Sequence, residues 1–411
     1  MNVARRRALT AFLALGSALT FLPDSAAAVA NRDREKPEFV VPPYVGAYQP
    51  QGTDEQGQWL QADEAERTIR DLPVVIQDEE LNAYVRSVLC RAVGNDRCGS
   101  ARIYILRLPV FNATMSANGT MHVYSGLLLR VRNEGELASI LAHEFAHFEL
   151  RHSLTRFRAR RSASDALAWA SVLVGFSQNS GLRYGTSFQD LLYAVHGSLA
   201  AYNRNQEREA DLLSFAYTTQ SQFRPSASAD VWRAVMNESD ASAVARGQRT
   251  NRYGGVPFLA SHPSDLERAD TLSLMANRIP SAGDYDGREQ YRTAMARWIP
   301  EFLSDQIKLN DFGGTEFIIA RLASDGWTAD LHYARAELYR TRGNPRDLIS
   351  AIGFYREALA LNPQMHAAKR GLGLSLIRSG SVAEGRIALQ AFLEAQPDAL
   401  DAAMLRTLIQ P

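Results

Sequence analysis

The chain has 411 residues, of which 46% are hydrophobic and 22% charged, a composition typical of a globular protein of about two domains. It holds 45 Lys and Arg residues against 45 Asp and Glu residues, so it carries no excess of positive charge. Because nucleic-acid binding depends on such an excess, we expect no nucleic-acid partner.

The first thirty residues have the pattern of a secretory signal peptide. Three arginines, Arg5 to Arg7, precede an apolar run over 8–22, and a patch of small residues ends at Ala30. This pattern predicts export to the periplasm and cleavage near Ala30. An uncleaved membrane anchor is the alternative, although the apolar run is short for a spanning helix.

Residues 31–60 are expected to form a linker, because prolines and glycines interrupt every regular pattern there. From 61 to 93 the apolar residues recur with helical spacing, and Asp78 is placed to cap a helix. Cys90 and Cys98 are predicted to form a disulfide, as expected in an exported protein. A pair of buried free thiols is the alternative.

Strand signals follow the cysteines. Residues 101–108 alternate as in a β-strand, and Asn118-Gly119 predicts a tight hairpin between two further short strands. A helix is expected soon afterwards, from about Asn133. A free edge of this small sheet would be able to hold an extended peptide by strand addition.

The segment 136–152 contains an HExxH motif made of His143, Glu144 and His147. Residues four apart lie on one face of a helix, so both imidazoles can bind one metal ion. Glu144 projects beside that metal, where a general base can accept a proton from water. The flanks are mostly apolar and contain no proline or glycine from 136 to 152, which indicates a buried helix.

Two apolar helices are expected at 164–176 and 188–203, separated by a candidate mobile loop at 175–187. Neither helix is long or apolar enough to span a bilayer. The next stretch is strongly helical and places Glu207 and Asp211 four residues apart on one face.

A catalytic zinc site usually has three protein ligands and one open position. Glu207, His152, His196 and His262 are the candidates for the third ligand, and Glu207 is preferred because Asp211 can then orient a ligand histidine. The alternative is that Glu207 and Asp211 form a solvated helix face paired with basic neighbours, namely Arg204 and Arg208.

Four separated motifs resemble one known family. In chain order they are Asn112-Ala113, HEFAH at 143–147, EREAD at 207–211 and SHPSDLER at 261–268. They are similar to the motifs of the HExxH/ExxAD gluzincin metallopeptidases, which include the HtpX heat-shock protease and the CAAX prenyl protease. The resemblance covers residues 61–280.

The resemblance implies a role for each matching residue. Glu207 is the third zinc ligand and Asp211 supports a ligand histidine, while Asn112 and Ala113 line the substrate cleft. Arg268 stabilises the oxyanion. His262 either joins it in that role or occupies the fourth metal position as a switch that holds the enzyme off.

The last part of the chain has signs of helical repeats. Pro363 and Pro397 are 34 residues apart, the period of a tetratricopeptide repeat. Ala336, Tyr339 and Gly343 fit the first helix of the first unit if 344–350 hold a three-residue insertion. Gly373 and Gly385 fall at repeat positions in the second unit. Helices from 284 to 325 are expected to pack on this array, which would present a surface to a protein partner. A plain helical bundle is the alternative.

We therefore predict an α+β protein, with a mostly helical zincin-type domain that has a small sheet and, after it, an all-α repeat domain. The expected parts are a signal peptide (1–30), a linker (31–60), a metalloprotease domain (61–280) and a tetratricopeptide-like domain (281–411). The expected cofactor is one zinc ion per chain.

The predicted activity is the hydrolysis of peptide bonds in unfolded or misassembled envelope proteins. This expectation rests on a further resemblance, to the periplasmic members of the family that assist β-barrel assembly. Outer-membrane assembly machinery is the expected partner, with peripheral membrane association. The rival function is a chaperone or assembly scaffold that works through the repeats and has a latent zinc site blocked by His262.

Overall fold

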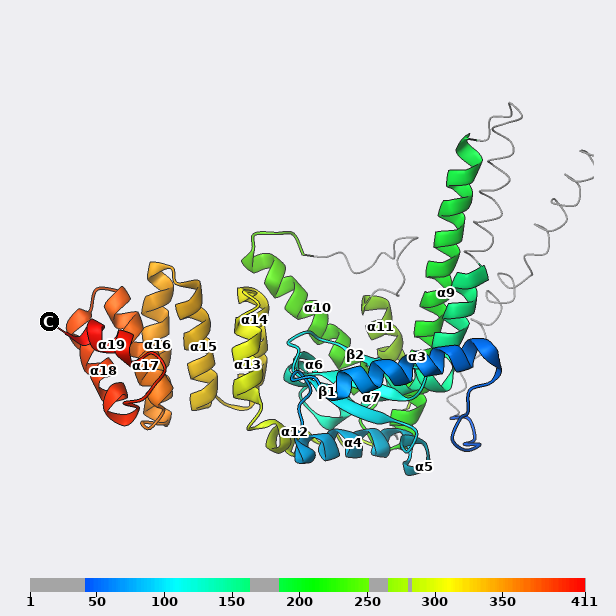
Figure 1. The fold of residues 1–411 in the computed structure, drawn as a ribbon, viewed down its shortest axis with the longest axis horizontal. Helices are drawn as coiled ribbons and strands as arrows, with labels where there is room; N and C mark the ends of the chain where they lie inside the picture. The colour runs from blue at the N-terminus through cyan, green and yellow to red at the C-terminus, as the bar shows by residue number, and fades with distance from the viewer. Residues whose placement is uncertain (1–40, 163–184, 251–264, 280–282, 411) are drawn as a thin grey trace, which may run out of the picture. The chain divides into compact units, whose positions relative to one another are not determined.

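The computed structural model describes residues 41–162, 185–250, 265–279 and 283–410, with only the backbone of 185–202 (Figure 1). The predicted signal peptide, the predicted helix at 164–176 and His262 lie outside the described residues, and His196 is described by its backbone alone.

Two helices precede the sheet. Helix α3 spans Gly52–Arg70 and α4 spans Glu79–Val93. The Asp78 carboxylate accepts a hydrogen bond from the backbone N–H of Leu81 at 2.8 Å, so it caps α4 as predicted. The linker predicted to extend to residue 60 ends earlier, because α3 already begins at Gly52. The Glu55 carboxylate stabilises that start, since it accepts from the N–H of Gln51 at 2.7 Å.

The short helix α5, Asn95–Cys98, follows α4 directly. A disulfide joins Cys90 on α4 to Cys98, eight residues later, with an S–S distance of 2.06 Å. It fixes the turn between α4 and the sheet.

The sheet has three strands in the order β1-β3-β2: β1 (Arg102–Leu106), β3 (Thr120–Tyr124) and β2 (Ala113–Met115). Strand β1 is parallel to β3, and β2 is antiparallel to it. The predicted hairpin is present between β2 and β3. Gly119 has a φ of +87°, and a Cβ there would lie 2.2 Å from the backbone oxygen of Ser100, so the turn requires glycine.

The two faces of the sheet have different partners. Ile105, Met121 and Val123 are fully buried in the core. On the other face Glu66 of α3 accepts hydrogen bonds from Arg102 at 2.6 and 2.7 Å, and from the hydroxyls of Thr120 and Tyr104 at 2.8 and 2.9 Å. Helix α3 therefore covers one face of the sheet and is held there by the hydrogen bonds of Glu66, while the other face of the sheet is apolar.

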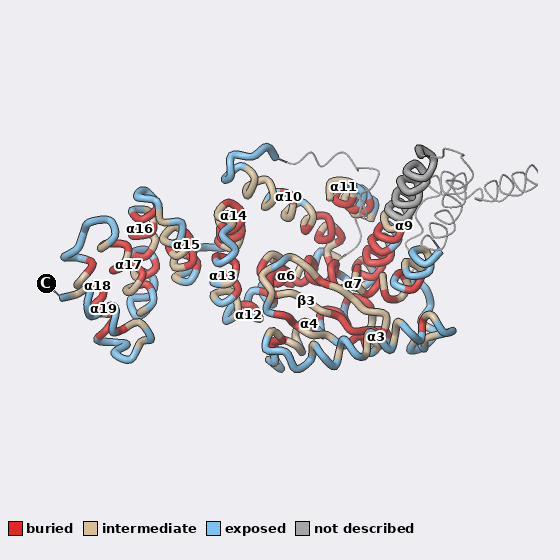
Figure 2. Tube along the Cα trace, turned by 45° about the horizontal axis from the view of Figure 1, so that its top comes forward, coloured by how far each residue is buried: buried red, intermediate tan, exposed pale blue. Residues whose placement is uncertain are grey.

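After a short helix α6, Ser125–Arg130, comes the helix that carries the HExxH motif, α7, Glu134–Glu149. The side chain of Asn133 caps α7 by accepting from the N–H of Glu136 at 2.7 Å. Helix α7 is buried along nearly its whole length, and it packs against α4, α9, α10 and β2 (Figure 2). The motif thus lies in the protein interior, as its apolar flanks predicted.

The helix α9 runs from Gly185 to Gln220 without a break. It replaces the separate helices predicted on either side of residue 203, and it also takes up the last residues of the predicted loop at 175–187. Helices α10 (Ala227–Ala245) and α11 (Asp265–Ala276) complete this part of the fold. None of the helices searched among the described residues combines the length and apolar character needed to cross a bilayer.

Helices α12 (Arg288–Met295), α13 (Ile299–Ile307) and α14 (Phe312–Leu322) share one apolar core with α7 and the sheet. A 3-10 turn, Ala323–Asp325, follows α14. The core cluster extends from Ile76 to Leu338. The domain boundary predicted at 280 therefore does not coincide with a boundary in packing.

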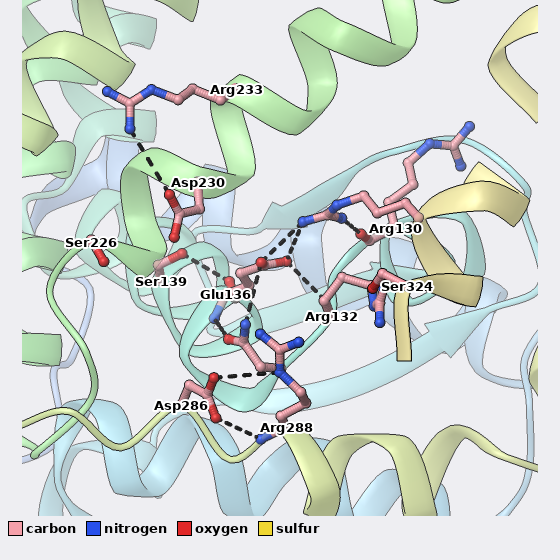
Figure 3. A network of polar contacts seen from close by, with 12 residues as sticks. Arg130, Arg132, Glu136, Ser139, Ser226, Asp230, Arg233, Asp286, Arg288 and Ser324 are labelled. Atoms are coloured by element: carbon pink, nitrogen blue, oxygen red, sulfur yellow. Dashed lines mark hydrogen bonds and ion pairs between the residues drawn. The ribbon is translucent and has the colours of Figure 1, made fainter. Parts of the chain in front are cut away.

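Polar contacts also join these helices at the N-terminus of α7 (Figure 3). Glu136, which is 3% exposed, accepts from the Arg132 N–H at 2.8 Å and from the guanidinium of Arg321 on α14 at 3.0 and 3.1 Å. Arg130 of α6 donates to Glu238 of α10 at 2.7–3.1 Å.

Helices α15 (Ala329–Arg342), α16 (Pro345–Leu361), α17 (His366–Arg378), α18 (Val382–Ala395) and α19 (Ala402–Ile409) end the chain. The first four form two helical hairpins, α15 with α16 and α17 with α18. Both helices of the second hairpin begin 37 residues after their counterparts, and α16 has 17 residues against 14 in α18.

The second hairpin is held close by two glycines. A Cβ on Gly373 would lie 2.9 Å from the backbone oxygen of Gly385, and a Cβ on Gly385 would lie 2.8 Å from that of Gly373. These contacts and the hairpin spacing are compatible with a 34-residue repeat that holds a three-residue insertion. The tetratricopeptide assignment stays a prediction.

Candidate metal centre

Three side chains from two helices converge where α7 packs against α9. The Nε2 atoms of His143 and His147 are 3.1 Å apart, and each lies 3.5 Å from a carboxylate oxygen of Glu207. A tetrahedral ion with ligand bonds of 2.0–2.2 Å places neighbouring ligand atoms about 3.3 Å apart. His143 faces Oε2 of Glu207 and His147 faces Oε1, so each imidazole lies at the separation that such an ion requires from one of the two carboxylate oxygens. The three side chains offer ligand atoms that all lie within 4.8 Å of one another, and among the described residues they form the group of His, Cys, Asp or Glu side chains that could hold a metal.

The other ring nitrogen of His143 is held by Asp211. Its Nδ1 lies 3.0 Å from the Asp211 carboxylate, one turn after Glu207 on α9. Glu207 and Asp211 are 5% and 8% exposed, so they do not form the solvated helix face that was the alternative. Arg208, one of the two basic neighbours in that alternative, pairs with Glu267 at 2.7 Å.

Arg268 of α11 is buried beside this pair, at 7% exposure. Its guanidinium donates two hydrogen bonds to Asp211, at 2.6 and 2.8 Å, and stacks 3.7 Å from the ring centroid of Trp232 on α10. The positive charge of Arg268 therefore already has a carboxylate partner. Its side chain fixes Asp211, which in turn contacts His143.

His152 contacts His147 on the ring nitrogen Nδ1, and not on the Nε2 that lies toward the metal position. Its Nδ1 is 2.8 Å from the Nδ1 of His147, and its Nε2 is 3.2 Å from a carboxylate oxygen of Glu209. Arg151, just after the end of α7, has a φ of +57°, and this left-handed residue turns the chain so that His152 meets His147. The candidate third ligand His152 is thus placed behind a ligand histidine.

Glu144 is half-buried on α7, between the two histidines in sequence. Burial raises the pKa of its carboxyl group to about 7, and the Glu207 carboxylate acts in the same direction. A carboxyl group with a pKa near neutrality is suited to both accepting and releasing a proton. A cation bound beside it would favour its charged form.

The two histidines differ in their electrostatic surroundings. Burial lowers the pKa of His147 to about 4. For His143, burial and Arg268 oppose protonation, but the hydrogen bonds with Asp211 and Glu207 outweigh them and raise its pKa to about 9. The two carboxylates that raise the pKa of His143 would in the same way favour a metal cation bound at its Nε2.

Strand β2 lies at one edge of the sheet, next to α7. Asn112 directly precedes it, and the Asn112 carbonyl accepts from the N–H of Tyr124 on β3 at 3.2 Å. Ala113 is buried at 8% exposure. Among the described residues β2 pairs with β3 alone, so its outer edge faces away from the sheet.

Two contacts of this site were missed by sequence reasoning. Trp232 lies on α10, and nothing in its own segment signals that its ring meets Arg268. His152 was weighed as a metal ligand and set aside, but the bond that it makes to His147 depends on the turn at Arg151. A histidine five residues after an HExxH motif, just past the end of its helix, is the signal that was available.

Comparison with known proteins identifies the family. The model of peptidase family M48 matches residues 72–276, a span that contains all the side chains described above for this centre. This part of the chain belongs to peptidase family M48. Helices α4 to α11 and the sheet thus form an M48 segment, and the convergence of His143, His147 and Glu207 lies inside it.

Curated relatives share this segment. The chain is 28% identical over 187 residues to the mitochondrial metalloendopeptidase OMA1 of Schizosaccharomyces pombe, covering 45% of this chain and 50% of the relative. It is 29% identical over 222 residues to a putative beta-barrel assembly-enhancing protease of Vibrio cholerae, covering 52% and 43%.

A third relative, the metalloprotease YcaL of Escherichia coli, is 35% identical over 129 residues, covering 31% of this chain and 48% of the relative. The chain thus spans about half the length of the curated relatives that it matches, or less. Two of these relatives are named as metallopeptidases and the third as a protease, in agreement with the M48 match.

Proposed function

We propose that this chain is an exported zinc metalloendopeptidase, with one zinc ion per chain, that hydrolyses peptide bonds in unfolded or misassembled envelope proteins. The observation that carries the proposal is the convergence of His143, His147 and Glu207: the two Nε2 atoms lie 3.1 Å apart, and each lies 3.5 Å from one of the two carboxylate oxygens of Glu207. Sites with two histidines and a glutamate on zinc are typical of metallopeptidases.

In this proposal, three residues hold the metal and Glu144 transfers the proton during peptide hydrolysis. When bound by His143, His147 and Glu207, zinc supplies Lewis-acid chemistry, which polarises a carbonyl and lowers the pKa of water. Glu144 accepts the proton of the attacking water and delivers it to the leaving amine. Its half-buried carboxyl group has a pKa already raised to about 7, so it can perform both transfers.

Arg268 acts in this proposal through Asp211. Its two hydrogen bonds to Asp211 hold that carboxylate against His143 Nδ1, which keeps Nε2 directed at the metal position. The oxyanion role that the resemblance implies for Arg268 stays a prediction. So do the two roles of His262, as an oxyanion donor or as the fourth ligand of a resting state.

An extended substrate would bind along β2. The outer edge of this strand offers backbone hydrogen bonds beside α7, and backbone pairing tolerates varied side chains. Asn112 and Ala113 would line the cleft. This mode of binding suits a protease that acts on unfolded chains.

The cellular setting of the proposal rests on three observations. Relatives named beta-barrel assembly-enhancing protease match half of the chain. Residues 1–30 have the pattern of a signal peptide, which supports export of the enzyme to the periplasm. The helical hairpins α15–α18 offer a surface for a protein partner, for which outer-membrane assembly machinery is the candidate.

The test is cleavage of casein by the purified protein, measured together with its zinc content before and after chelation. We expect one zinc per chain, activity lost on chelation, and Glu144→Gln that retains zinc but not turnover. Arg292→Ala, at an exposed site remote from the centre, is the matched control. A wild-type protein that binds no zinc, or a fully active Glu144→Gln variant, would refute the proposal and favour a scaffold function.

A further inference from the structure

The two ligand histidines are supported by different chemical groups. The Nδ1 of His143 faces the carboxylate of Asp211 at 3.0 Å, whereas the Nδ1 of His147 faces another imidazole, that of His152, at 2.8 Å. The rings of His147 and His152 meet nearly edge-on, with centroids 4.9 Å apart and planes at 71°. The site therefore contains a third histidine that the chemistry described above does not use.

The directions of the hydrogen bonds follow from the metal position. Two nitrogens 2.8 Å apart can share one hydrogen. A neutral imidazole that gives its Nε2 lone pair to a metal carries its hydrogen on Nδ1, so His147 donates and His152 Nδ1 accepts. The hydrogen of His152 is then on Nε2, which lies 3.2 Å from a carboxylate oxygen of Glu209. Each N–H donor in this series of hydrogen bonds, from His147 through His152 to Glu209, therefore has an acceptor.

We propose that His152, oriented by Glu209, is a positioning residue that fixes the tautomer and the ring orientation of His147 for metal binding. The inference rests on the proposed metalloprotease function and deepens it. A partner behind a metal-bound histidine typically raises metal affinity ten- to a hundredfold. Here that partner is a neutral ring, which carries no negative charge into the centre.

The surroundings of His152 hold it in place. Its side chain is 4% exposed, and its backbone carbonyl accepts from the side-chain amide of Gln206 at 3.4 Å. Gln206 directly precedes Glu207 on α9, so the same helix that carries the third ligand also anchors His152. Glu209, by contrast, is 62% exposed, so its bond to His152 competes with water.

The test measures the zinc dissociation constant of the whole chain by competition with a fluorescent zinc chelator. We expect His152→Ala to weaken zinc binding about ten- to a hundredfold. His152→Asn should return affinity to within a few-fold of wild type, because its side-chain oxygen can accept the bond from His147 Nδ1. Glu209→Ala should have a smaller effect than His152→Ala. His366→Ala, a histidine on the remote helix α17, is the control.

A readout of folding separates positioning from general damage. Thermal unfolding of the metal-free variants should show that His152→Ala and His152→Asn are similarly stable while their zinc affinities differ. Zinc binding by His152→Ala within twofold of wild type, or an Asn variant as weak as the Ala variant, would overturn the inference. A wild-type protein that binds no zinc would instead refute the proposed function.

Discussion

Glu136, in the first turn of α7, accepts two hydrogen bonds from Arg321 at 3.0 and 3.1 Å, although the two residues are 185 positions apart in the chain. The side chains of Glu136 and Arg321 are 5% and 23% exposed. A buried carboxylate without a cation is strongly unfavourable. Helix α14, which lies beyond the M48 segment, therefore completes the surroundings of the helix that carries His143 and His147.

Arg321→Met leaves Glu136 buried without its cation. Losing one partner of a buried pair costs about 3–5 kcal/mol, and partial exposure of Arg321 reduces the expected loss to about 2–4 kcal/mol. Urea unfolding of the metal-free protein measures this loss of unfolding free energy. The double variant Arg321→Met/Glu136→Gln should regain part of it, because glutamine carries no charge. Arg292→Ala breaks an exposed pair with Glu289 and should cost under about 1 kcal/mol. Equal losses in the two single variants would show that the Glu136 pair contributes little.

Glu207→Ala should lose most of its zinc. The substitution removes the carboxylate whose two oxygens each lie 3.5 Å from one of the histidines, and two histidines alone bind zinc weakly. Metal analysis after gel filtration gives the zinc content per chain. Glu267→Ala, which removes a partner of Arg208, the residue next to Glu207, should keep a full zinc. Full zinc in Glu207→Ala would transfer the third-ligand role to another residue.

Arg268→Met separates positioning from oxyanion stabilisation. If Arg268 acts by holding Asp211 against His143, zinc affinity should fall about tenfold or more together with turnover. Chelator competition and casein cleavage are measured on the same preparation. An unchanged zinc affinity combined with a large loss of turnover would assign Arg268 to the oxyanion instead.

Stability should depend on pH through Glu66. Hydrogen bonds from Arg102, Thr120 and Tyr104 lower its pKa to about 2 against the opposing effect of burial. A lowered pKa in the folded state means that the stabilisation is present above about pH 5 and is lost as the pH falls towards 2. Because the side chain of Arg102 is 46% exposed, solvent weakens its ion pair with Glu66. We therefore expect Glu66 to contribute about 1–2 kcal/mol to the free energy of unfolding, less than the full pKa shift would imply.

Unfolding measured from pH 6 to pH 2.5 tests this expectation. Glu66→Gln should show a shallower loss of stability on acidification than the wild type. Glu64→Gln, whose ion pair with Arg67 is exposed, should follow the wild type. If the stability of Glu66→Gln fell with pH in parallel with that of the wild type over the whole range, the stabilising role of the Glu66 hydrogen bonds would be contradicted.

Removing the disulfide should destabilise the fold modestly. Cys90 and Cys98 are eight residues apart, and a loop of that size contributes about 2–3 kcal/mol on the chain-entropy model. The double variant Cys90→Ser/Cys98→Ser and the reduced wild type should unfold at the same lower urea concentration. Reducing agent should not change the double variant. Free thiols in the untreated wild type, detected by alkylation and mass spectrometry, would contradict the pairing.

Local patterns predicted much of this fold. The Asp78 cap, the start of a helix near Asn133 and the Asn118-Gly119 turn depend on residues a few positions away, so the sequence around them carries the information. The same holds for His143 and His147, because helical spacing alone brings their rings together.

Other features depend on packing between distant segments. The stacking of Trp232 on Arg268 and the pairing of Glu136 with Arg321 arise only after helices have docked. No periodicity within one segment reveals such partners. The early start of α3 has a different cause, since a single carboxylate, Glu55, stabilises a helix in a segment whose glycines indicated a linker.

The core cluster that reaches from Ile76 to Leu338 has a consequence for biosynthesis. A ribosome releases the N-terminal part of a chain first, so His143, His147 and Glu207 emerge well before α12 to α14. A nascent chain that ends at residue 276 holds all three ligand residues, but Glu136 has no Arg321 to pair with. The helix that bears the HExxH motif therefore reaches its final environment only after Arg321 has also emerged, about 45 residues beyond the end of the M48 segment.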